Sequence, residues 1–442
     1  MSSILTNNGA MVALQTLKSI NSGLATTQQE ISTGKRVSNA KDNSAVWAIS
    51  KVMEADVKGF KGISDSLNLG QSTVAVARQA AETTTELLTD IKGKIVAAQE
   101  ENVDREKIQT DINALRDQIS AVVGAAQFNG LNLLSNTSTT AGSGSINVLA
   151  SLDRSGTGVT ASDINVAKQD LGTTASSINV ATAAYNAAGT GTSGAASTGA
   201  VALAAAASPA STLAVVGSAA GAGSTAVTAG TGYIIEITAS GGAFASMNTT
   251  ATAGNQEITY VARDGDTEAD VAAGLVEAFN KYVAEDSAAS AAGISAAVNG
   301  SSGNQIDFTG GDLSQGAGTV SLQIRTASAA NTTIGGRLEA LNDIDVTTQA
   351  GADSALEEIE GLIQTAIDSA SAFGSAQGRI ETQTDFITGL TDALKSGIGT
   401  LVDADMEEAS ARLQALQVQQ QLGVQALSIA NQAPQQLLSL FR

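Results

Sequence analysis

The 442-residue sequence contains no histidine and no cysteine. These two residues supply the commonest metal ligand, the base of Ser-His-Asp triads and the nucleophile of Cys-His dyads. The lack of cysteine also excludes disulfide bonds within the chain. We therefore expect a protein that is not an enzyme and that holds no metal ion or cofactor.

Proline and aromatic residues are also scarce. Pro209 and Pro434 are the only prolines, and Phe, Trp and Tyr together make up 3% of the chain. Because proline interrupts helices, a chain that nearly lacks it is free to form very long ones. Hydrophobic residues make up 43% of the chain. Because so few of them are aromatic, the core must consist mainly of Ala, Leu, Ile and Val.

Basic residues are much fewer than acidic ones. The chain has 23 Lys and Arg residues against 43 Asp and Glu residues, which gives a formal net charge of −20. Nucleic acids and anionic membranes select for basic surfaces, so we expect neither as a partner. No run of about 18 apolar residues occurs, so we expect no membrane insertion. The segment from Met1 to Gly9 lacks a basic stretch and a continuous apolar run, so we expect no Sec signal peptide.

Both ends of the chain carry a helical repeat that the Ala-, Gly-, Ser- and Thr-rich middle, residues 136–350, lacks. In three segments, mostly apolar residues alternate at spacings of three and four, which is the seam of a coiled coil. The seams consist of Phe60, Ile63, Leu67, Gly70, Val74, Ala77, Ala81, Thr84, Leu88, Ile91, Ile95 and Ala98; of Ile108, Ile112, Leu115, Ile119 and Val122; and of Leu356, Ile359, Ile363, Ala366, Ala370, Phe373, Gln377, Ile380, Thr384, Ile387, Thr391, Leu394 and Ile398. Because an apolar seam must be covered, we expect three helices that pack as a bundle, with Asp104 as the N-cap of the second.

The outermost segments repeat the pattern more weakly. One stripe comprises Ala10, Ala13, Leu17, Ile20, Leu24, Thr27 and Ile31, and the other Met406, Ala409, Leu413, Leu416, Gln420, Gly423, Leu427 and Ala430. Small and polar residues weaken both stripes, so we expect these ends to be frayed or disordered in a lone subunit and ordered by neighbouring copies. The predicted subunit-packing residues are Leu17, Ile20, Leu24, Ile31, Leu413, Leu416, Leu427, Leu440 and Phe441.

The middle contains a recognisable α+β module at about 231–326. Segments 233–238, 257–261, 294–298, 306–309 and 320–325 read as strands, and Val271, Leu275, Ala278, Phe279 and Tyr282 form the apolar stripe of a helix. Residues 172–230 are of low complexity, and we expect loosely structured or short-stranded chain there. The expected fold class is α+β, a long antiparallel α-helical coiled-coil bundle formed by both chain ends with a β-rich insertion between them.

Four acidic residues in this module, Asp264, Asp266, Glu268 and Asp270, alternate as in a calcium-binding loop. The twelfth position of such a loop requires a bidentate Glu, and here it is Leu275. We therefore interpret the segment as a turn followed by negative charge at the start of a helix.

Three sets of motifs resemble those of bacterial flagellins. Residues 32–42, Ser-Thr-Gly-Lys-Arg-Val-Ser-Asn-Ala-Lys-Asp, resemble the family's linker between terminal helix and rod. Residues 127–134, Gln-Phe-Asn-Gly-Leu-Asn-Leu-Leu, resemble its turn into a β-hairpin, and residues 429–433 and 438–442 resemble its closing segment. The expected domains are a terminal helix and linker at 1–42 that pairs with 399–442, a rod from 43–135 and 351–398, and a variable outer insertion at 136–350.

The resemblance implies a structural subunit that polymerises into the hollow filament of the bacterial flagellum. It implies export of the unfolded chain by the flagellar type III apparatus and a location outside the cell. The implied partners are other copies of the chain, an export chaperone, a cap protein and hook-filament junction proteins. A hook-filament junction protein, which assembles into small rings, is the alternative, and an adhesive role of the middle region stays open.

Flagellins that activate the vertebrate flagellin receptor carry an Arg-Val-Arg-Glu-Leu-Ala-Val-Gln-like stretch on the first rod. At the matching positions Lys92 and Lys94 replace both Arg residues, Ile95 replaces Glu, and Gln99 is kept. Asp111 keeps a downstream acidic position. Because Lys lacks the bidentate fork of Arg, we expect weak or no activation of that receptor.

Overall fold

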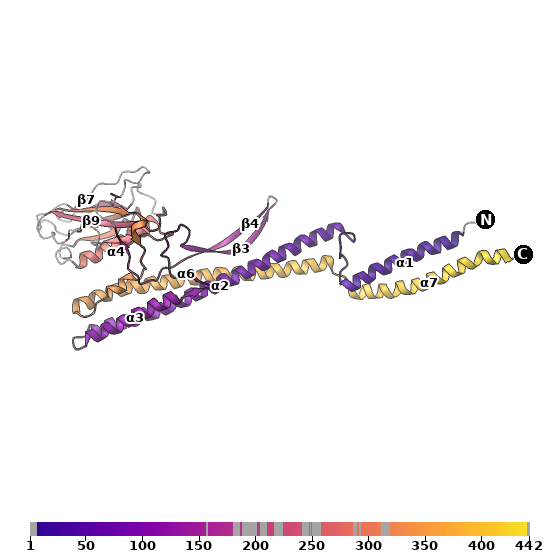
Figure 1. The fold of residues 1–442 in the computed structure, drawn as a ribbon, viewed down its shortest axis with the longest axis horizontal. Helices are drawn as coiled ribbons and strands as arrows, with labels where there is room; N and C mark the ends of the chain where they lie inside the picture. Colours follow the sequence, from indigo (N-terminus) through magenta and orange to yellow (C-terminus); the bar gives the residue numbers. More distant parts are fainter. Residues whose placement is uncertain are drawn as a thin grey trace. The chain divides into compact units, whose positions relative to one another are not determined.

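A computed structural model describes residues 7–155, 158–179, 186–187, 201–203, 210–215, 224–240, 258–285, 293–310 and 319–439, and the single residues 247, 249 and 290 (Figure 1). The chain divides into two compact units. The terminal unit comprises Met1–Ser66, Ala150–Ser162 and Thr382–Arg442, and the central unit comprises Leu67–Leu149 and Asp163–Glu381. Two long helices, α2 (Ser44–Ala98) and α6 (Gln349–Val402), contribute residues to both units.

The terminal unit contains a pair of helices made by the two chain ends. Helix α1 spans Asn8–Thr33 and helix α7 spans Met406–Ser439, and the two run side by side (Figure 1). Asn7 caps α1, because its side-chain oxygen accepts a hydrogen bond from the backbone N–H of Ala10 at 3.0 Å. The helix ends at Gly34, whose φ of 68° lies in the left-handed region that glycine adopts without strain.

The predicted seam of α2 is confirmed. Eleven of its twelve positions are fully buried, and only Phe60 is half-buried. Helix α3 (Arg105–Ala125) follows, and Ile112 and Ile119 of its seam are buried as well. Asp104 caps α3 as predicted, accepting a hydrogen bond from the backbone N–H of Lys107 at 3.2 Å. A seam this complete accounts for a helix of 55 residues, because burial of an apolar face stabilises helices more than intrinsic propensity does.

The predicted seam of α6 is correct at alternate positions and one residue out at the others. The buried positions that it names include Ile359, Ala366, Phe373 and Ile380. The positions between them, Leu356, Ile363, Ala370 and Gln377, are half-buried, whereas Ala355, Leu362, Ser369 and Ala376 are buried. The buried positions themselves alternate at spacings of four and three, so α6 does carry a heptad seam, and at every second position the prediction chose the wrong one of two neighbouring residues.

Two β-hairpins follow α3 in the sequence. The first joins β1 (Gln127–Phe128) and β2 (Leu131–Asn132) through Asn129 at φ 52° and Gly130 at φ 79°. Positive φ at both central residues is the mark of the type I′ turn that suits a two-residue hairpin. The second hairpin is formed by β3 (Ser145–Ser155) and β4 (Gly158–Ala167), and it was not predicted from the sequence.

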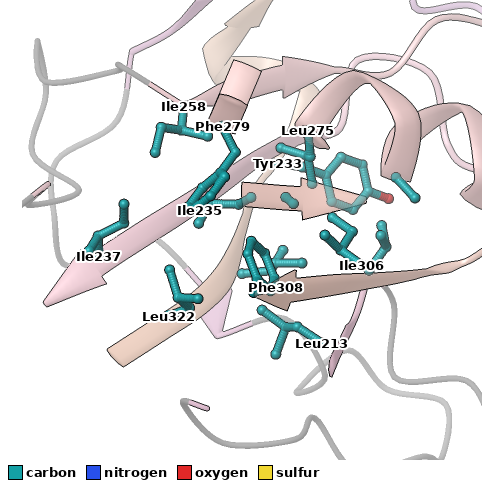
Figure 2. Close-up of a cluster of buried hydrophobic side chains, with 14 of the residues drawn as sticks. Leu213, Tyr233, Ile235, Ile237, Ile258, Leu275, Phe279, Ile306, Phe308 and Leu322 are labelled. Atoms are coloured by element: carbon teal, nitrogen blue, oxygen red, sulfur yellow. The ribbon is translucent and has the colours of Figure 1, made fainter. Parts of the chain in front are cut away.

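The predicted α+β module is confirmed. Its elements are β9 (Gly232–Ser240), β10 (Thr259–Val261), α4 (Glu268–Glu285), β11 (Ser295–Val298), β12 (Gln305–Thr309) and β13 (Thr319–Ala327). One sheet has the order β10-β9-β13-β6, with β7 also pairing with β13, and a second has the order β11-β12-β8. The two sheets and α4 share one core, in which the rings of Phe279 and Phe308 meet edge to face at 4.9 Å (Figure 2).

Short strands lie in the low-complexity region, as expected. They are β5 (Ser177–Ile178), β6 (Asn186–Ala187), β7 (Val201–Leu203) and β8 (Ala210–Ala214), and β5 pairs with β14 (Thr332–Thr333). Strand β8 pairs antiparallel with β12, and its Leu213 is buried opposite Ile306. The structure thus confirms an α+β fold with helical chain ends that pack together and a β-containing middle.

The packing of β3 on α2 yields a test. A Cβ atom at Gly70 would lie 2.6 Å from Cγ1 of Val148, so Gly70→Ala should overpack this contact and destabilise the protein by about 1–3 kcal/mol. A Cβ atom at Gly62, on the same helix, would have no neighbour within 4 Å. Gly62→Ala should therefore stabilise the helix by about 0.5–1 kcal/mol. Urea unfolding followed by circular dichroism measures both, and equal stability of the two variants would contradict this contact.

Candidate assembly surface

The two terminal helices run antiparallel. At the start of α1, Nδ2 of Asn7 donates a hydrogen bond to the backbone oxygen of Ala430, near the end of α7, at 2.8 Å. Farther along the pair, Nε2 of Gln420 donates to Oδ1 of Asn21 at 2.7 Å. The first and last parts of the chain therefore lie together, as a pairing of its two ends requires.

Glycines bring the two helices close together. A Cβ atom at Gly423 of α7 would lie 3.4 Å from Cδ1 of Leu17, and one at Gly23 of α1 would lie 3.6 Å from Leu416. Both glycines thus lie directly opposite a leucine of the other helix. Leu17 and Leu416 are among the predicted packing residues, so the structure places them between the two helices of one subunit.

The other predicted packing residues occupy similar positions. Ile20, Leu24, Ile31, Leu413 and Leu427 are half-buried, while most of their helix neighbours are exposed. Leu440 and Phe441 lie outside the described residues. We call the weak stripes of α1 and α7 together the inner stripe. Of its fifteen positions only Thr27 and Ala409 are fully buried, and Met406 is exposed.

The two breaks that separate the terminal helices from α2 and α6 are tied to each other. Lys35 forms an antiparallel bridge with Asp403, the backbone N–H of Arg36 donates to the oxygen of Val402 at 2.7 Å, and that of Ala404 donates to the oxygen of Gly34 at 3.0 Å. This joint fixes α1 against α7 at one end of the pair.

A second set of bonds shapes the linker after α1. Oδ2 of Asp42 accepts hydrogen bonds from the backbone N–H groups of Asn39 at 3.1 Å and Ser38 at 3.0 Å. These bonds hold the pKa of Asp42 below its ordinary value, and the bond from the backbone of Asn39 has the largest effect. The linker motif that resembles flagellins therefore folds into a defined turn.

Large apolar side chains on the outside of the pair were missed by the sequence analysis. On α1 they are Met11, Val12 and Leu14, and on α7 they are Val418, Leu422, Val424 and Ile429. Val418, Leu422 and Ile429 follow one another at intervals of four and seven, which is helical spacing for one face. The signal was present in the sequence, but the neighbouring inner stripe of α7 has the same spacing and three leucines against one.

The residues of the receptor-like stretch are engaged within the chain. Lys92 forms an ion pair with Glu360, and Nζ of Lys94 lies 2.5 Å from Oδ2 of Asp111. Ile95 is fully buried in the α2 seam. Lys92 and Lys94 thus have partners within the chain, and Ile95 faces the core. Weak activation of the receptor stays a prediction.

Asp264 and Asp266 of the alternating acidic segment accept hydrogen bonds, Asp264 from the chain before β3 and Asp266 from within the module. Oδ2 of Asp264 accepts a hydrogen bond from the backbone N–H of Gly144 at 2.6 Å. Oδ2 of Asp266 accepts from the hydroxyl of Tyr260 at 2.8 Å and from the backbone N–H of Arg263 at 2.7 Å. Burial, reinforced by the charge of Asp266, raises the pKa of Tyr260 above its ordinary value.

Glu268 and Asp270 lie in the first turn of α4, which confirms the interpretation as a turn and a helix start. Glu268 accepts a hydrogen bond from Nδ2 of Asn304 at 2.9 Å, and Asp270 accepts from the backbone N–H of Thr267 at 2.8 Å. Among the described residues, no three acidic side chains converge as a metal site would require.

Comparison with known proteins agrees with this geometry. The family models for the bacterial flagellin N-terminal and C-terminal helical regions match residues 4–139 and 356–441. The chain is 34% identical to Flagellin A and 33% identical to Flagellin B of Rhizobium meliloti, in each case over 448 aligned residues that cover 100% of both chains. The chain belongs to the bacterial flagellin family. This flagellin is therefore a structural subunit that polymerises into the filament of the bacterial flagellum.

The flagellin also resembles the solved structure of FlgL from Xanthomonas campestris. The identity is 12% and the TM-score 0.30, over 78% of this chain and 98% of that one, which is too low to bear on the kind of assembly formed. Within the part of the chain that the structure describes, no helix has the length and apolar composition needed to cross a membrane.

Proposed function

We propose that copies of this flagellin polymerise through the antiparallel pair of α1 and α7, which forms the inner part of the filament wall. The observation that carries the proposal is that the pair has apolar side chains on both its inner and its outer side. The predicted packing residues Leu17, Ile20, Leu24, Ile31, Leu413, Leu416 and Leu427 position the two helices, and we assign Leu440 and Phe441 to the same assembly.

The inner stripe alone buries little apolar surface. Nearly all of its positions stay half-exposed, in contrast to the α2 seam. Hydrophobic stabilisation scales with the apolar area removed from water, so a lone pair gains little from closing. Neighbouring copies would supply the missing cover and order the chain ends, which couples folding of these ends to polymerisation.

The family relationship supports the remaining partners. We propose that the unfolded chain leaves the cell through the flagellar type III apparatus and acts outside the cell. We further propose that an export chaperone holds the C-terminal helix, that a cap protein assists assembly at the tip, and that hook-filament junction proteins anchor the polymer. The domains proposed are the pair of 1–42 with 399–442, the rod of 43–135 with 351–398, and the outer insertion of 136–350.

Truncation tests the role of the chain ends. Deletion of residues 1–33 or 406–442 should leave a folded monomer that does not polymerise, because each deletion removes one helix of the pair. Sedimentation after addition of filament seeds measures this, with the full-length chain as control. Normal filaments from either truncation would refute the proposal. Short rings from the full-length chain in negative-stain microscopy, instead of long tubes, would favour a hook-filament junction protein.

Residues 175–334, which include the α+β module, should be dispensable for assembly, because the chain enters and leaves this segment at adjacent points. The backbone N–H of Gly336 donates to the oxygen of Thr174 at 2.8 Å, and that of Leu338 donates to the oxygen of Gly172 at 3.0 Å. Replacement of residues 175–334 by a short glycine link should therefore preserve seeded polymerisation.

That deletion also removes Arg263, whose Nε lies 3.4 Å from Oδ2 of the buried Asp170. Asp170→Asn should accompany it, because a carboxylate left without its buried cation is strongly destabilising. The control is Asp170→Asn in the full-length chain, which isolates the effect of that substitution. A deletion variant that unfolds cooperatively but forms no filaments on seeds would overturn the prediction.

A further inference from the structure

A buried pair of opposite charges lies where the α+β module joins the rest of the central unit. Arg263, in the turn between β10 and α4, is 5% exposed, and Asp170, on the segment that leads into the module, is 2% exposed. Nε of Arg263 lies 3.4 Å from Oδ2 of Asp170, and neither atom has a hydrogen-bond partner among the described residues. Burial removes the hydration of both charges, and an ion pair offsets that cost only with good hydrogen-bond geometry, which this pair lacks.

The guanidinium of Arg263 contacts both segments that connect the module to the rest of the chain. Asp170 belongs to the entering segment, and Nη2 of Arg263 donates a hydrogen bond to the backbone oxygen of Gly335, in the leaving segment, at 2.8 Å. Nη1 donates to the hydroxyl of Tyr260, in β10 of the module itself, at 3.3 Å. Because the guanidinium is planar and rigid, its nitrogens reach all three partners in only one arrangement of module and segments.

The entering and leaving segments are fastened to each other. The backbone N–H of Ser176 donates a hydrogen bond to Oε2 of Glu339 at 2.5 Å. A Cβ atom at Gly336 would lie 1.8 Å from the backbone oxygen of Gly172, so the two segments cross at a distance that only glycine permits. The two segments therefore form one base, which the Arg263 side chain contacts from the module.

Lys281 of α4 forms a second and more exposed attachment. Its Nζ lies 2.7 Å from Oδ2 of Asp343 and 3.1 Å from Oε1 of Glu358 on α6, and its side chain is 38% exposed. Exposed ion pairs contribute little and are screened by salt, and the flexible lysine stem accepts several geometries. This attachment holds α4 near α6 but does not select one angle between them.

We propose that the pair of Arg263 and Asp170 fixes the orientation of the α+β module on the central unit, and that this specificity, rather than stability, is the reason for its burial. Apolar residues of similar volume often replace a buried ion pair without loss of stability, but they do not direct a side chain to particular partners. The proposal concerns the single subunit and does not depend on polymerisation. In a filament, every copy would then present the same face of its module.

Distances between two spin labels test the proposal. Because the chain has no cysteine, Ala273→Cys on α4 and Ser354→Cys on α6, both at exposed positions, provide two labelling sites for pulsed electron paramagnetic resonance. With Arg263 and Asp170 in place, the distance distribution should be a single narrow peak. Arg263→Met combined with Asp170→Leu should broaden that peak or add a second one, while the midpoint of thermal unfolding stays the same or rises.

The matched control removes the same two charges inside the module. Arg325 on β13 forms an ion pair with Glu236 on β9, the neighbouring strand of the same sheet. Arg325→Met combined with Glu236→Leu should leave the distance distribution unchanged. A second test variant, Arg263→Lys, keeps a positive charge beside Asp170 but loses the planar fork that reaches both segments, so it should broaden the distribution as well.

Four results would overturn the proposal. One is a narrow, unshifted peak in the folded apolar variant. Another is an unfolding midpoint of that variant well below that of the unmodified chain, because the pair would then chiefly stabilise the fold. Equal broadening in the control would show a general effect of lost charge. Broadening by Lys281→Met, with none in the apolar variant, would assign the orientation to the exposed attachment instead.

Discussion

The proposed assembly of this flagellin depends on the contact between α1 and α7, and this contact leaves most of its positions only half-buried. The helices have 26 and 34 residues, yet their inner stripe has only two fully buried positions, Thr27 and Ala409. In α2, by contrast, eleven of twelve seam positions are fully buried. The α2 seam is therefore covered within the subunit, whereas in our proposal the terminal pair completes its burial only with neighbouring copies. We therefore propose that polymerisation is driven by this difference in burial between two parts of one chain.

Charge and connectivity fit the same division of roles. The terminal pair is almost neutral although the chain carries a net charge of −20, so the acidic surface that keeps monomers apart lies outside the pair. The α+β module has a separate core around Phe279 and Phe308 and is entered and left near Gly172 and Gly336. A segment with its own core and adjacent ends tolerates change, although this one is also tied to α6 by the ion pair of Lys281 with Glu358 at 3.1 Å.

The sequence predicted most of this fold because long helices and regular strands leave strong periodic signals. The α2 seam, the Asp104 cap and the strands from β9 to β13 were all recognisable from spacing and turn residues. The α6 seam was one residue out at alternate positions, because neighbouring residues such as Leu362 and Ile363 are both apolar and spacing does not show which of the two is covered. The β3–β4 hairpin was missed, although Ile146, Val148 and Ala150 of β3 repeat at the two-residue spacing of a strand. Spacing alone also could not separate the inner stripe from the exposed Val418, Leu422 and Ile429, because both repeat with the same helical period and only the structure shows which side faces the partner helix.

Amide hydrogen exchange of the dilute monomer and of the filament is the most direct measurement of the central claim. The account predicts that amides of 8–33 and 406–439 exchange rapidly in the monomer, while the buried seam of α2 is protected, and that the same terminal amides become strongly protected in the filament. Terminal amides that are as protected in the dilute monomer as those of the α2 seam would contradict it.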